Sequence, residues 1–190
     1  MKSPLYIFPS LYEKLIPFHH GHAYKERMFL IKLLLKGKRI LELGCGTGIN
    51  SIFLDGDYYG FDANEEFIKY GKKKGRNINY GNIYNIPLKN CDAILIVDVL
   101  HHLPDHCKLL KKIVSTGKEV VVCEPFNHKP KSKLIGCIYS KIGELLDSDG
   151  INKPVHWYNK SELKRFFNEL GKCNISIVGE DLVAHYPTRR

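Results

Sequence analysis

The 190 residues are enough for one domain with a hydrophobic core and too few for two full domains. Hydrophobic residues make up 44% and charged residues 26%, a balance typical of a globular protein and not of a disordered or membrane-spanning chain. The formal net charge of +9 suits an anionic partner. The lysines and arginines form separate clusters, however, which is equally typical of a solvated surface.

The first ten residues, MKSPLYIFPS, contain neither a long apolar segment nor a small-residue cleavage site. No apolar run elsewhere approaches the length of a membrane span. We therefore expect no signal peptide, no membrane span and a cytoplasmic location. The six cysteines are widely spaced without a C-x-x-C pair, which favours buried free thiols over disulfides or a zinc site.

Two helices are predicted before the first strand. The shorter covers residues 10–16, and Pro17 would end it. Ser10 and Glu13 have the spacing of a capping box at its start. The longer helix covers residues 22–36 and would stop at a glycine. Its apolar face consists of Tyr24, Met28, Ile31 and Leu35.

Strands and helices alternate along the rest of the chain. The predicted strands cover residues 38–43, 57–61, 77–80, 92–100, 118–124, 173–179 and 181–186. Helices are predicted near Gly48, after the capping residue Asn64, and over residues 104–115, 132–147 and 159–170. The run DAILIVDVL is nearly all apolar, as expected for a parallel strand covered on both faces. This alternation predicts one α/β domain around a mostly parallel sheet.

Three glycines at alternate positions follow the first predicted strand, in the stretch ILELGCGTG. A strand followed by a glycine turn and a helix presents backbone N–H groups to a ligand, and glycine allows both the tight turn and the close approach. The spacing is G-x-G-x-G, and residue 49 is Ile49, so the G-x-G-x-x-G fingerprint of a dinucleotide site is not met. The chain also lacks the phosphate-binding G-x-x-x-x-G-K-[ST] pattern.

The stretch ILELGCGTG resembles motif I of the class I S-adenosylmethionine-dependent methyltransferases. YGFDAN and YGNIYNIPL resemble later segments of that family, and IVDVLHHLPD, VVVCEP and HWYNKSELKRFF resemble its ubiquinone-biosynthesis-like group (methyltransferase type 11). The resemblance covers residues 37–186. It implies a Rossmann-like, seven-stranded, mostly parallel sheet with helices on both faces and an antiparallel last strand. It also implies S-adenosyl-L-methionine as cofactor and S-adenosyl-L-homocysteine as product.

The resemblance assigns cofactor contacts to individual positions. The expected cofactor-binding residues are Glu42 for the methionine ammonium, Gly44, Cys45, Gly46 and Gly48 for the methionine portion and ribose, Asp62 and Ala63 for the ribose, Asn82 and Ile83 for the adenine, and Asp98 at the methionine end. A carboxylate suits a ribose because it can accept both hydroxyls. Asn82 stands where the family usually has aspartate, but it keeps a carbonyl acceptor. Asp62, Asn82 and Asp98 are also compatible with ordinary capping, turn and strand-end roles.

Methyl transfer to a hydroxyl or a protonated amine requires a base, and histidine suits that role near neutral pH. His101 and His102 follow the fourth predicted strand, at the edge of the sheet where such folds bind ligands, and are the candidate catalytic residues. A structural hydrogen-bonding role fits them equally. We expect no metal site, because this chemistry needs no metal.

The acceptor pocket is expected from the regions with the fewest motifs. His20, Tyr24 and Trp157 are the candidate substrate-binding residues, with surface or packing roles as the alternatives. We expect residues 1–36 to form an amino-terminal helical lid over a methyltransferase domain of residues 37–190.

These patterns predict an enzyme that transfers a methyl group from S-adenosylmethionine to a small-molecule acceptor, which the net charge allows to be anionic. Nucleic acid is a less favoured partner, because no appended RNA-binding segment and no N-P-P-[YF] tetrapeptide are present. RNA or protein methylation and a non-catalytic cofactor-binding module are the alternatives. The motifs select neither the acceptor atom nor an oligomeric state.

Overall fold

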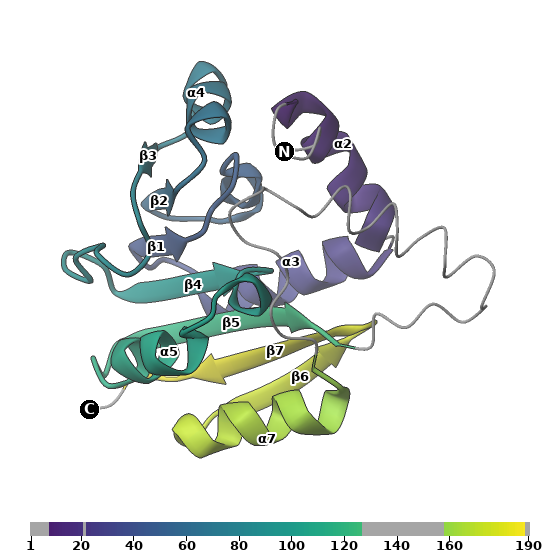
Figure 1. The fold of residues 1–190 in the computed structure, drawn as a ribbon, viewed down its shortest axis with the longest axis vertical. Coiled ribbons are helices and arrows are strands. Elements are labelled where there is room, and N and C mark those ends of the chain that lie inside the picture. Colours follow the sequence, from purple (N-terminus) through teal and green to yellow (C-terminus); the bar gives the residue numbers. More distant parts are fainter. Residues whose placement is uncertain (1–7, 21, 127–157, 189–190) are drawn as a thin grey trace.

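The computed structural model describes residues 8–20, 22–126 and 158–188 and shows a central sheet with helices on both sides (Figure 1). The strands are β1 (Ile40–Leu43), β2 (Tyr58–Asp62), β3 (Ile78–Tyr80), β4 (Ala93–Val97), β5 (Glu119–Pro125), β6 (Asn174–Val178) and β7 (Asp181–Tyr186). Their order is β3-β2-β1-β4-β5-β7-β6. Strands β1 to β5 are parallel, whereas β7 is antiparallel to both β5 and β6. The predicted seven-stranded, mostly parallel sheet with an antiparallel last strand is confirmed.

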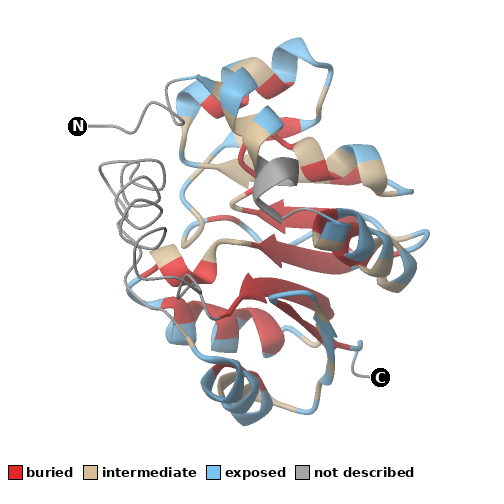
Figure 2. Cartoon of the chain, turned by 90° about the vertical axis from the view of Figure 1, so that its right-hand side faces the viewer, coloured by how far each residue is buried: buried red, intermediate tan, exposed pale blue. Residues whose placement is uncertain are grey.

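The described helices cover both faces of this sheet. They are α2 (Pro9–His20), α3 (His22–Leu34), α4 (Glu65–Lys73), α5 (His106–Val114) and α7 (Lys160–Leu170), with the 3₁₀ helices η1 (Ile49–Phe53) and η2 (Leu100–His102). Alternate strand residues face opposite sides: Leu41 and Leu43 belong to the core under α5 and α7, and Ile40 and Leu95 to the core under α3. Figure 2 shows the resulting pattern, with buried central strands and helices that are exposed on their outer sides.

The predicted amphipathic helix over residues 22–36 is confirmed as α3. Its four predicted face residues are at most 2% exposed: Tyr24, Met28, Ile31 and Leu35. The helix ends before Gly37, whose φ of +71° favours glycine. The side chain of Asn64 caps α4, and Asn159 with Glu162 forms a capping box at the start of α7, as predicted.

The prediction for the first helix was wrong in its end and in its cap. Helix α2 runs from Pro9 to His20 and passes through Pro17. It packs against both α3 and α4. The carboxylate of Glu13 does not close a capping box, because it pairs with Arg76 and accepts a hydrogen bond from the Tyr70 hydroxyl.

Three further predictions concern the state of the cysteines, the absence of membrane-spanning helices and a helix over residues 132–147. Among the described cysteines, Cys45, Cys91 and Cys123 are buried free thiols, whereas Cys107 is exposed. None of the described helices combines the length and the apolar composition that a membrane crossing requires. The helix predicted over residues 132–147 lies outside the described residues.

Candidate functional site

The glycine turn connects β1 to η1 at the carboxyl edge of the sheet. Gly44, Gly46 and Gly48 have φ values of +73°, +56° and +76°, a region that residues with a side chain rarely adopt. The backbone N–H groups of Gly44 and Cys45 both donate to the carbonyl of Phe61, at 2.8 and 3.0 Å. The turn is therefore fastened to the end of the neighbouring strand β2.

Protein side chains approach all three glycines. A Cβ on Gly44 would lie 2.5 Å from a γ-carbon of Val99, and one on Gly48 would lie 2.8 Å from a γ-carbon of Ile78. A Cβ on Gly46 would lie 3.3 Å from the hydroxyl oxygen of Tyr12 in α2. Two of the glycines are thus required by packing within the domain, and Gly46 is the one that faces the cover formed by α2.

Asp62 lies at the end of β2 and is bonded directly to this turn. Its Oδ2 accepts from the N–H of Gly46 and its Oδ1 from the N–H of Asn64, both at 2.8 Å. Asp62 is half-buried and the adjacent Ala63 is exposed, so this end of β2 lies at the surface beside the turn.

The predicted adenine-contacting residues lie in the loop after β3, beside Asp62. The loop begins with Gly81, whose N–H donates to the Asp62 carbonyl at 2.9 Å. Asn82 is exposed, and its Oδ1 accepts from the N–H of Tyr84 at 3.0 Å, which closes a local turn. Ile83 is half-buried against the core. The structure therefore brings Asn82, Ile83, Asp62 and the glycine turn together at one edge of the sheet.

Glu42 lies beneath the turn instead of opening toward it. The residue has 0% exposure; its Oε1 accepts from Asn50 Nδ2 at 2.7 Å, and its Oε2 accepts from the Tyr58 hydroxyl. Burial raises the pKa of Glu42 to about 7, against the opposing effect of these two hydrogen bonds. Tyr24 of α3 approaches the same Asn50, with 3.5 Å between its hydroxyl and Oδ1, and burial raises the pKa of Tyr24 to about 12.

Asp98 follows β4 with a φ of +56° and is held by a buried arginine. Arg27 of α3 donates to both carboxylate oxygens of Asp98, at 3.1 and 2.7 Å, and to Asp181 Oδ2 at 3.1 Å. Burial acts to lower the pKa of Arg27, but the nearby acidic groups, Asp98 and Asp181 among them, and the hydrogen bond to Asp98 together outweigh it, and the pKa is raised. Sequence reasoning missed Arg27, because it is one of several charged residues in the predicted helix and no local pattern sets it apart.

His101 and His102 lie side by side in η2, with ring centroids 4.1 Å apart. The Nδ1 of His101 is 2.7 Å from Oε2 of Glu124, a residue that is 2% exposed. The other oxygen of Glu124 accepts from the N–H groups of Val99 and Leu100, both at 2.8 Å. Glu124, which sequence reasoning also missed, therefore fixes the loop after β4 and orients His101.

The comparisons with known proteins agree with this geometry. Residues 41–119 match the family model Methyltransf_11, a methyltransferase domain. A ubiquinone biosynthesis O-methyltransferase of Paraburkholderia phymatum is 28% identical over 160 residues, which cover 76% of this chain and 68% of that protein. Residues 41–119 therefore carry the methyltransferase domain of a class I S-adenosylmethionine-dependent methyltransferase.

Solved methyltransferase structures share the whole fold. A SAM-dependent methyltransferase of Thermotoga maritima, described as a possible histamine N-methyltransferase, superposes with a TM-score of 0.71 at 19% identity and covers 97% of this chain and 98% of its own. The DhpI–SAH complex superposes with a TM-score of 0.69 at 19% identity, covering 95% and 92% of the two chains. S-adenosyl-L-methionine is the cofactor of this methyltransferase, and a structural neighbour was solved with the product form.

The residues at the glycine turn fit this cofactor. The carboxylate of Asp62 suits a ribose diol, and a Cβ on Gly46 would fill the space between the turn and Tyr12. Within the described segments, no group of three or more His, Cys, Asp and Glu residues could hold a metal ion.

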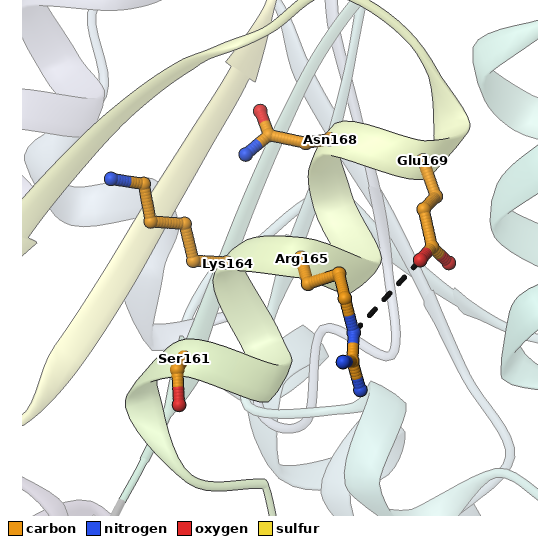
Figure 3. Close-up of a pocket in the computed structure, with 5 residues that line it drawn as sticks. All are labelled: Ser161, Lys164, Arg165, Asn168 and Glu169. Atoms are coloured by element: carbon orange, nitrogen blue, oxygen red, sulfur yellow. Dashed lines mark ion pairs between the residues drawn. The ribbon is translucent and has the colours of Figure 1, made fainter.

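Two candidate substrate-binding residues of the methyltransferase lie beyond the described side chains. His20 is the last residue of α2, and nothing of its side chain is described; Trp157 lies outside the described residues. A shallow hollow lies instead on the exposed face of α7, where Arg165 and Glu169 pair at 3.9 Å (Figure 3). It belongs to one helix at the β7 side of the sheet, far along the strand order from the glycine turn, and carries no functional assignment.

Proposed function

We propose that this methyltransferase transfers the methyl group of S-adenosylmethionine to a small-molecule acceptor, with the cofactor bound across the glycine turn, Asp62 and the loop of Asn82. The observation that carries the proposal is the 2.8 Å hydrogen bond from the Gly46 N–H to Asp62. It joins a glycine-rich turn to a half-buried carboxylate at the end of β2. Such a pair suits a ligand that presents a ribose diol close to a backbone.

In this proposal Asp62 accepts the ribose hydroxyls, and Asn82 and Ile83 take the adenine through the side-chain carbonyl and the backbone. Asp98, whose side chain is 27% exposed, bounds the methionine end while Arg27 fixes its position. Glu42 and Tyr24 are buried beneath the turn, so we assign them to supporting the site from within the core. His20 and Trp157 stay predictions for the acceptor pocket.

When bound, the cofactor supplies a methyl group already activated by its sulfonium. The protein must then align an acceptor and exclude water, and it must remove a proton if the acceptor is a hydroxyl or a protonated amine. His101 and His102 are our candidates for that proton transfer. Glu124 supports His101 in this role, because a carboxylate at Nδ1 fixes the tautomer and the orientation of an imidazole.

A small acceptor is supported by the described relatives, whose names refer to ubiquinone biosynthesis and to histamine. The free thiols of the described cysteines are compatible with the proposed cytoplasmic location. We retain a lid over the site as part of the proposal, and assign it to α2 alone, because α3 is part of the core.

Calorimetric titration with S-adenosylhomocysteine tests the cofactor site. Asp62→Asn should weaken binding by about tenfold to a hundredfold, the equivalent of about 1.5–3 kcal/mol for hydrogen bonds to a charged group. Asp55→Asn is the matched control, because it removes an exposed carboxylate paired with Lys32 at 3.0 Å and should leave the affinity unchanged. Equal affinity in wild type and Asp62→Asn would contradict the ribose assignment.

Transfer of a labelled methyl group into fractionated cell extract, with and without ribonuclease, tests the acceptor class. We expect the label in the small-molecule fraction and no effect of ribonuclease. Label that disappears with ribonuclease, or that stays with protein, would replace the small-molecule assignment by RNA or protein methylation.

A further inference from the structure

Arg76 connects the glycine turn to the helix that covers it. It lies between α4 and β3, and its Nη1 donates to the carbonyl of Thr47 in the turn at 3.0 Å. The same guanidinium pairs with the carboxylate of Glu13 in α2. One planar group therefore binds the turn and its cover at the same time, which the five donors of a guanidinium allow.

Glu13 stands next to the residue that faces the turn. Tyr12 lies over Gly46, and its ring packs on Phe67 of α4 with 4.6 Å between centroids. The Glu13 carboxylate also accepts from the Tyr70 hydroxyl at 3.4 Å. A shift of Glu13 away from Arg76 would therefore also move Tyr12 from the turn.

The ion pair between Arg76 and Glu13 is shielded from solvent, unlike the pair between Arg39 and Asp92 at the other end of β1. The side chains of Arg76 and Glu13 are only 10% and 13% exposed, whereas those of Arg39 and Asp92 are 53% and 43% exposed. Exposed pairs are screened by water and contribute little, while a shielded pair is stronger but must offset the loss of hydration. The presence of this shielded pair is therefore better explained by the position that it gives to α2 over the turn than by a contribution to stability.

We propose that Arg76 is a positioning residue for the cofactor, which sets the position of α2 over the glycine turn through its contacts with Glu13 and Thr47. The inference rests on the proposed cofactor site. The Glu13–Arg76 pair must open for the cofactor to pass between α2 and the turn, and its closure returns Tyr12 to its place over Gly46. Arg76 touches neither reacting atom and acts through these two segments.

Two variants remove the pair from opposite sides. Arg76→Met keeps the aliphatic stem that packs near Gly48 and removes the guanidinium. Glu13→Gln removes the negative charge of Glu13 and leaves the contact between Arg76 and the Thr47 carbonyl in place. Arg39→Met is the matched control, because it makes the same change in an exposed bidentate pair just before β1, at the opposite end of that strand from the turn.

Two measurements on the full chain report the effect. Calorimetry with S-adenosylhomocysteine should show binding weakened by about tenfold in Arg76→Met, less in Glu13→Gln and unchanged in Arg39→Met, since hydrogen bonds to charged groups exceed exposed ion pairs in strength. Amide hydrogen exchange of the free protein should be faster in α2 for the first two variants, with α3 unchanged.

The outcomes separate this inference from the proposed function. Suppose that wild type binds S-adenosylhomocysteine and that both variants keep its affinity and its rate of amide exchange in α2. This result would overturn the positioning role of Arg76 and leave the proposed cofactor site intact. Faster exchange throughout α3 as well would also overturn it, because the residue would then act on the fold as a whole. A wild-type protein that fails to bind S-adenosylhomocysteine would overturn the proposed cofactor site and this inference with it.

Discussion

Helices α2 and α3 follow one another in the sequence but serve the glycine turn from opposite sides. Helix α3 lies beneath it and buries Tyr24, Arg27, Met28 and Ile31 in the core. Helix α2 lies over the turn through Tyr12 and Glu13, and its Leu11 is 40% exposed. Burial anchors α3, whereas the contacts described for α2 are the polar and aromatic ones of Tyr12 and Glu13. The region of lower local stability is therefore the one that can open for a ligand.

The variant Arg27→Met in α3 tests this difference between the two helices and has the largest expected effect on stability. We expect a loss of about 3–5 kcal/mol in the free energy of unfolding, because the change removes the buried guanidinium that pairs with both Asp98 and Asp181. Urea unfolding measures it, with Lys25→Met on the exposed side of the same helix as the control. A loss as small as that of the control would show that α3 is no better anchored than α2.

Local sequence patterns predicted most of the helices and strands, but few of the ion pairs and hydrogen bonds that hold them together. The apolar spacing of about 3.6 residues located α3, and short apolar runs located the strands, the central ones being buried on both faces. The Arg27–Asp98 and Glu13–Arg76 pairs join residues 71 and 63 positions apart, so no local pattern announces them. The predicted capping box at Ser10 and Glu13 failed because α2 begins at Pro9, which places Ser10 inside the helix; the carboxylate of Glu13 pairs instead with the distant Arg76.

The candidate site divides in the same way. Asp62 and the glycines followed from spacing and resemblance, and the structure joins them by a hydrogen bond. The direction in which Glu42 faces did not follow, because strand alternation assigns a face only once the neighbouring strands and helices are known. Glu124 carried one signal, an acidic residue inside a strand that is buried along its whole length.

A second test concerns the buried support beneath the turn and its dependence on pH. The pKa of Glu42 is raised by burial to about 7 in the folded protein, from 4.5 when exposed. The folded state therefore binds more protons than the unfolded state between these values, and stability contributed by protonated Glu42 is lost as the pH rises toward 7. Glu42→Gln removes this dependence while keeping the shape of the side chain.

Urea unfolding of wild type and Glu42→Gln at pH 5, 6, 7 and 8 measures the difference. As the pH rises, the free energy of unfolding of the variant should increase relative to that of wild type, by on the order of 2–3 kcal/mol over the whole series. Other titrating groups cancel in the comparison because both proteins share them. A constant difference across the series would show that Glu42 is not held neutral beneath the turn.

The most selective test, with a modest expected effect on binding, is the deletion of residues 1–21. This truncation removes α2 and leaves α3, so the domain should stay folded with a modest fall in melting temperature. Affinity for S-adenosylhomocysteine should fall by about tenfold or less, which corresponds to about 1.4 kcal/mol, because the turn, Asp62 and Asn82 are all retained. Methyl transfer should be lost almost completely, since the cover that excludes water from the sulfonium is gone.

Deletion of residues 1–36 is the companion variant, and it should abolish folding because it also removes the buried face of α3. Melting temperature, affinity and turnover measured on one sample of each truncation separate the alternatives. Full turnover in a stable 1–21 deletion would rule out a covering role for α2, and a joint loss of all three would make α2 a packing element like α3.

Arg76→Met should weaken binding no more than this deletion if Arg76 acts through α2 alone. Any excess would therefore measure its separate contact with the Thr47 carbonyl.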